Sequence, residues 1–141
     1  MDVTSAYLRA FGIGVVAGLR SMTAPAIARA KTKDNISAVL TMAMLGEMLV
    51  DKLPITPSRT LPVALVVRAI SGGVSAAIVV AGVHDVDRRI AIGLGAAGAI
   101  AGSFVGERIR VTAAGKVPDT LVALVEDLVA FTLGSNLASD A

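Results

Sequence analysis

The chain has 141 residues, of which 55% are hydrophobic and 17% charged, and its formal net charge is +2. Soluble domains average about 25% charged residues, so this deficit, together with a mean hydropathy of +0.76, favours an integral membrane protein of a single domain, residues 1–141. The net charge is too small to indicate a nucleic-acid partner, and the absence of cysteine excludes disulfides and thiolate metal sites. Tryptophan is absent and Tyr7 is the only tyrosine, which is the best argument for the alternative, a soluble helical bundle.

The first apolar segment, about residues 5–30, holds the feature around which the rest of the chain is interpreted. Arg20 lies deep inside it, where an arginine in lipid costs roughly 2.5–3.5 kcal/mol. Pro25 has no N–H group, so the carbonyl of Ser21 loses its helical donor and the helix is predicted to break. With the hydroxyls of Ser21 and Thr23, the break could form an anion site facing the N-terminus of a second half-helix. The alternative is an ordinary salt bridge from Arg20 to Glu47 or Glu126, with no ligand.

The second and third segments add charges to the apolar interior. About residues 36–53 form the second segment, in which Glu47 and Asp51 share one helix face. Asp51 could instead lie at the interface and only anchor the end of the helix. The third segment, about residues 61–83, carries Arg68 roughly two turns from its start. We expect Arg68 to pair with an acid or with loop carbonyls.

The fourth segment, about residues 90–106, is rich in small residues. Three of its glycines recur every four residues, at Gly98, Gly102 and Gly106. Such a face lets another backbone approach closely, either within the subunit or across a dimer.

The fifth segment, about residues 119–137, places Glu126 and Asp127 near its middle. Acids at this depth could bind a cation or relay protons, or they could only pair with the buried arginines. An unpaired buried charge costs several kcal/mol even after relaxation. We therefore predict that Arg20 contacts at least one of Glu47, Glu126 and Asp127.

The pattern as a whole predicts an all-α fold, a polytopic transmembrane helical bundle. It has about five membrane segments, the first of them broken, and each is close to the ~20 residues that a bilayer needs. A weak internal echo indicates a possible inverted repeat. The matching positions are Gly14, Arg29 and Glu47 in the first half and Gly93, Arg108 and Glu126 in the second.

Few residues offer other chemistry. His84 with Asp85 and Asp87 could ligate a metal, but one histidine and two loop acids are a weak signal, and a solvated loop is the simpler interpretation. No nucleophile–base arrangement and no phosphate-binding loop is readable. We predict no metal and no cofactor.

Four blocks of the sequence carry a resemblance to a known family. They are Gly18-Leu19-Arg20-Ser21-Met22-Thr23-Ala24-Pro25, then Glu47 with Asp51-Lys52-Leu53-Pro54, then Arg68 with Ser71-Gly72-Gly73, and finally Val125-Glu126-Asp127. Together they resemble an uncharacterised bacterial integral membrane family, filed as domain of unknown function 4126. The resemblance implies a small multi-pass protein of the bacterial inner (cytoplasmic) membrane, in contact with membrane lipid. It implies no activity.

The leading functional hypothesis is a small transporter or channel for an ion or small molecule, with a charged site between helices. Five short helices scarcely enclose a pathway alone, so we expect a homodimer or higher oligomer. The alternative is a non-transporting scaffold or lipid-binding protein whose buried charges are structural. A membrane enzyme acting on lipid ranks last. Water-filled access to Arg20 would favour transport, and a dry, paired cluster would favour the scaffold. The predicted site consists of Arg20, Ser21, Thr23, Glu47, Asp51, Arg68, Glu126 and Asp127.

Overall fold

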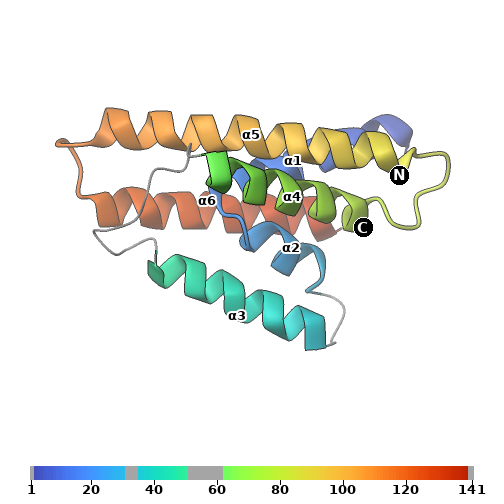
Figure 1. The fold of residues 1–141 in the computed structure, drawn as a ribbon, viewed down its shortest axis with the longest axis horizontal. Helices are drawn as coiled ribbons and strands as arrows, with labels where there is room; N and C mark the ends of the chain where they lie inside the picture. The colour runs from blue at the N-terminus through green and yellow to red at the C-terminus, as the bar shows by residue number, and fades with distance from the viewer. Residues whose placement is uncertain (1, 31–34, 51–61, 140–141) are drawn as a thin grey trace.

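The described part of the chain is entirely helical. A computed structural model describes residues 2–30, 35–50 and 62–139, apart from the side chains at 38, 47–50 and 139. Within these ranges no strand occurs, and the chain forms an elongated bundle (Figure 1). Its helices are α1 (Val3–Leu19), α2 (Thr23–Ala28), α3 (Asn35–Val50), α4 (Pro62–Val79), α5 (Arg88–Ala113) and α6 (Asp119–Ser139).

Aspartate side chains cap the N-termini of two helices. Asp2 accepts a hydrogen bond from the backbone N–H of Ser5. The pKa of the Asp2 carboxyl group is lowered, first by hydrogen bonding to the Ser5 side chain and to a smaller extent by this backbone N–H. Asp87 caps α5 in the same way, accepting from the N–H of Arg89 at 2.8 Å. Both helices therefore begin where a short polar side chain can replace the missing helical acceptor.

The predicted break in the first segment is confirmed. Helix α1 ends at Leu19, and Arg20 has an extended backbone (φ −143°, ψ 109°) before α2 begins at Thr23. The sequence analysis treats about residues 5–30 as one membrane segment with a break, but the two parts of this segment do not continue in one direction. α2 turns back toward the end of the molecule that holds both termini, so α1 and α2 run in opposite directions (Figure 1).

The contacts that α1 and α2 make with α6 agree with this reversal of chain direction. Arg20 pairs with Asp127, whereas Ile27 of α2 and Val16 of α1 both approach Gly134, two turns further along α6. The first segment is thus a helical hairpin that enters the bundle and returns. The extended residue at the break makes this reversal possible, because it ends the helical backbone hydrogen bonding of α1 within one residue.

Close backbone contacts through glycine hold α1, α4 and α5 together. A Cβ atom at Gly14 or Gly72 would lie only 2.1 or 2.4 Å from the carbonyl oxygen of Gly95. At Gly98 and Gly102 it would lie 2.3 Å from Phe11 O and 2.4 Å from Val15 O. No side chain fits at such distances, so glycine is required at these four positions.

The glycine face of α5 is therefore occupied within the chain. Gly98 and Gly102 pack on α1, and Gly106 is buried one turn further on. Of the two alternatives left open by the sequence, packing inside the subunit is the one observed. The proposed contact between two copies cannot use Gly98 and Gly102, because the backbone of α1 already covers them.

Three helices of the described part are long and apolar enough to cross a membrane: Pro62–Val79, Arg88–Ala113 and Asp119–Ala138. The apolar helices α1 and α3 are shorter. Aliphatic side chains such as Val63, Val66 and Ile70 stand exposed along α4, which suits a surface that faces lipid rather than water. The count of five membrane segments and the inverted repeat stay predictions.

The glycine contact can be tested with a pair of neighbouring substitutions. Gly102→Leu should destabilise the protein by about 1–3 kcal/mol or more, because the new side chain meets the backbone of α1. Ala101→Leu adds the same side chain at an exposed position and should be nearly neutral. Thermal unfolding in detergent measures both, and equal stability of the two variants would contradict this packing.

Candidate functional site

The polar centre of the molecule is built around the break between α1 and α2. The carbonyl of Gly18 accepts a hydrogen bond from the Arg68 guanidinium at 2.8 Å. It also accepts at 3.3 Å from the Ser103 hydroxyl, which shares its single hydrogen with the nearer carbonyl of Ala99 at 2.8 Å. The Ser71 hydroxyl donates to the carbonyl of Ser21. The carbonyls at the interrupted end of the helix have lost their helical donors. Side chains of α4 and α5 therefore donate hydrogen bonds to them instead.

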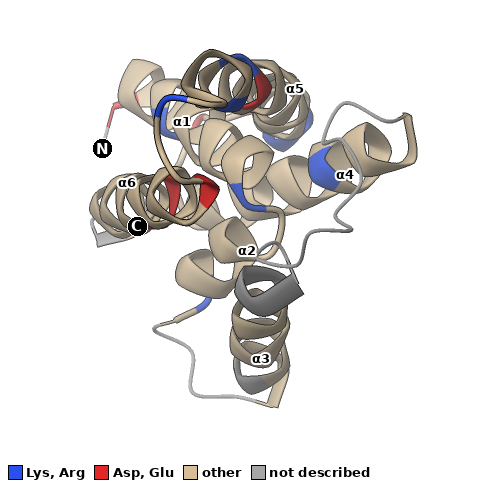
Figure 2. Ribbon diagram, turned by 90° about the vertical axis from the view of Figure 1, so that its left-hand side faces the viewer, with Lys and Arg blue, Asp and Glu red and all other residues tan. Residues whose placement is uncertain are grey.

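Arg20 completes this centre from within the break. Its side chain is fully buried, and it forms a salt bridge with Asp127 of α6, which is 14% exposed. The prediction that Arg20 contacts an intramembrane acid is confirmed. Figure 2 shows acidic positions (red) on the side of α6 that faces the other helices. The residues that pair at the break between α1 and α2 are called the break cluster. They are Gly18, Arg20, Ser21, Arg68, Ser71, Ser103 and Asp127.

Glu126 belongs to a separate pair. Its carboxylate accepts from the Nε and the terminal nitrogen of Arg110 at 3.1 and 2.9 Å. Glu126 itself is buried, whereas the Arg110 side chain is 29% exposed. Because adjacent residues of a helix point in different directions, Asp127 faces the break and Glu126 faces α5.

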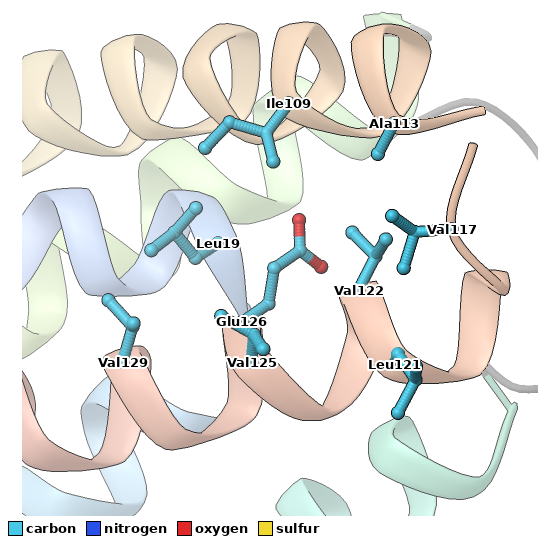
Figure 3. Close-up of a pocket in the computed structure, with 9 residues that line it drawn as sticks. All are labelled: Leu19, Ile109, Ala113, Val117, Leu121, Val122, Val125, Glu126 and Val129. Carbon is cyan, nitrogen blue, oxygen red and sulfur yellow. The ribbon is translucent and has the colours of Figure 1, made fainter.

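A cavity of about 440 Å³ lies between α5 and α6 beside this second pair. Figure 3 shows Glu126 rising from α6 into this space, with Leu19 and Val122 on either side of it. Glu126 is the single charged residue of the lining, and the other lining residues are aliphatic: Leu19, Ile109, Ala113, Val117, Leu121, Val122, Val125 and Val129. The cavity therefore offers room for hydrocarbon next to a neutralised acid.

The structure brings together four of the eight predicted site residues: Arg20, Ser21, Arg68 and Asp127. Thr23 is fully buried beside them, and its hydroxyl has no hydrogen-bond partner in the described part of the chain. Glu126 pairs elsewhere. The side chain of Glu47 and the whole of Asp51 lie outside the described residues.

Arg20 forms a salt bridge, as the alternative to the anion site expects, but the acid is Asp127, which that alternative did not name. Arg20 is neutralised by Asp127, and α2 is only six residues long. Across residues 2–30, 35–50 and 62–139, no three acidic or histidine side chains come together to hold a metal ion.

Three partners were missed by the sequence interpretation: Ser71, Ser103 and Arg110. Ser71 enters the sequence analysis only through the family resemblance, and Ser103 and Arg110 do not enter it. One signal was available for the serines. Hydroxyls inside apolar segments rarely stay without a function in packing or hydrogen bonding.

Comparison with known proteins finds no match. No protein-family model, curated protein sequence or solved structure is similar to this chain. The function of the break cluster is accordingly argued from its own geometry.

Two buried serines one turn apart on α4 provide a test of the break cluster. Ser71→Ala removes the bond to the Ser21 carbonyl and should lower the free energy of unfolding by about 1 kcal/mol or more. Ser75→Ala removes only a bond to the carbonyl of Ser71 in the same helix and should cost less. Chemical or thermal unfolding compares them. A larger loss for Ser75→Ala would overturn the assignment of Ser71.

Proposed function

We propose that this chain is a non-transporting integral membrane protein, a scaffold that holds lipid, in which the buried charges are structural. The single observation that carries the proposal is the state of Arg20. It is fully buried and salt-bridged to Asp127. A charge that binds a moving ion must exchange its partner, whereas a charge that supports a fold keeps it.

The bonding of the other buried charges supports the same function. Arg68 donates to a backbone carbonyl of the break, and Glu126 is neutralised by Arg110. Each of these interactions fixes one helix against another. This is the paired arrangement expected of a scaffold.

The chemistry of the cavity beside Glu126 also favours lipid over ions. Its walls are aliphatic except for that one carboxylate. A hydrated ion would lose its water there without gaining polar ligands, which is unfavourable. A lipid chain would instead bury apolar surface at no such cost.

The location of the protein is proposed from its resemblance to the uncharacterised bacterial family described above. That resemblance, together with three helices able to cross a bilayer, supports the bacterial cytoplasmic membrane. We also propose that copies of this chain form an oligomer. Their contact would use a face other than Gly98 and Gly102, which α1 covers.

One observation favours the second candidate, transport of a small ion or molecule. The hydroxyl of Thr23 is buried beside the break without a hydrogen-bond partner in the described residues. A polar ligand passing the break would supply that partner. A flux measurement therefore has to accompany any measurement of stability.

Glu126→Gln separates the two functions. In the scaffold, the substitution removes the charge that Glu126 contributes to its pair with Arg110 and should lower the free energy of unfolding by about 1.5–3 kcal/mol. Liposomes holding the wild-type protein should then show no uptake of protons or common ions. Asp119→Asn, an exposed acid at the start of α6, is the matched control and should change stability by less than about 1 kcal/mol.

The opposite pattern would establish transport. It would consist of a wild-type flux that Glu126→Gln abolishes while the variant unfolds at the wild-type temperature. The neutral amide keeps the shape of the carboxylate but can neither carry charge nor release a proton.

A further inference from the structure

A second groove, between α4 and α5, combines two arginines with an apolar floor. It has a volume of about 690 Å³ and lies on the outer side of these helices. Arg29 reaches it from the end of α2, and Arg88 lines it from the first residue of α5. The remaining lining residues are apolar or small, among them Ile70, Val74, Ile92 and Ala96.

The two arginines come from elements far apart in the sequence, yet they line the same groove. Their positive charges are complementary to an anionic group bound in the groove. The planar fork of each guanidinium suits the oxygens of a phosphate group, which can accept paired hydrogen bonds.

The position of the arginines matches the depth of lipid headgroups. Arg88 is the first residue of a helix able to cross a membrane, and α4 ends at Val79 on the same side of the molecule (Figure 1). The end of such a helix lies at the level of the phosphates of one leaflet. From Arg88 to Ala96 the groove follows α5 for about 12 Å. This length is close to the roughly 15 Å of hydrocarbon in one leaflet.

We infer that this groove binds one anionic phospholipid, with its phosphate between Arg29 and Arg88 and an acyl chain along α4 and α5 toward Ala96. The exposed aliphatic side chains of Ile70, Val74 and Ile92 would cover the chain. The inference rests on the proposed function in that it names the lipid class that this protein holds. It adds a headgroup preference that the cavity beside Glu126 does not supply.

The test measures lipid binding to the purified full-length chain in neutral detergent. Phosphatidylglycerol and phosphatidylcholine are titrated separately, and native mass spectrometry gives the apparent affinity for each. The wild-type protein should prefer phosphatidylglycerol. Arg88→Gln and Arg29→Gln should each reduce that preference about fivefold, as expected for one basic residue near anionic lipid.

A neighbouring arginine provides the matched control for charge. Arg89→Gln removes the same charge at the adjacent exposed position, which does not line the groove. It should leave the preference for phosphatidylglycerol unchanged. An equal loss from Arg89→Gln and Arg88→Gln would overturn the site, because the preference would then reflect the charge of the whole surface.

A second pair of variants tests the acyl chain. Ala96→Phe fills the inner end of the groove without changing charge and should weaken binding of both lipids severalfold. Ala101→Phe, at an exposed position of the same helix, should leave it unchanged. Unchanged lipid binding by Ala96→Phe, or equal protection from thermal unfolding by inorganic phosphate alone, would overturn the proposal. Neither result bears on Glu126→Gln and ion flux, so the scaffold function and this lipid site can fail separately.

Discussion

The structure depends on one constraint, the cost of leaving polar groups unpaired where a helix is interrupted inside an apolar bundle. The break after Leu19 leaves carbonyl groups without helical donors and places a guanidinium between helices. Each such group costs about 1–3 kcal/mol or more if it stays unpaired. Three other helices supply the partners: α4 and α5 bind the carbonyls of Gly18 and Ser21, and α6 neutralises Arg20. The break therefore determines how these helices are placed.

Close packing makes these bonds reachable. Serine side chains are short, so Ser71 and Ser103 reach the break only in a closely packed bundle, in which glycines bring α1 and α4 against α5. A Cβ atom added at Gly18 would lie only 2.2 Å from the carbonyl oxygen of Ala99. A larger residue there would separate α1 from α5 and withdraw Ser103 from its acceptor. The glycine contacts and the polar centre are thus two parts of one arrangement.

The sequence predicted the helical class, the break and the pairing of Arg20 with an acid, because each follows from local chemistry. A proline removes a known donor, and a buried charge demands a counter-charge. It did not predict that α2 turns back, because the direction of a chain after a break is decided by contacts far along the sequence, such as that of Ile27 with Gly134. For the same reason it could not select Asp127 over Glu126. Neighbouring acids on a helix look equivalent until the facing helices are placed.

The central claim is that Arg20 and Asp127 act as one structural unit, and a double-mutant cycle tests it most directly. The free energy of unfolding in detergent is measured for Arg20→Leu, Asp127→Leu and the double variant. Each single change removes one partner of this buried ion pair and should cost about 3–5 kcal/mol. The double variant removes both charges and should be more stable than either single variant. Losses that simply add would contradict the account, because the two residues would then not depend on each other.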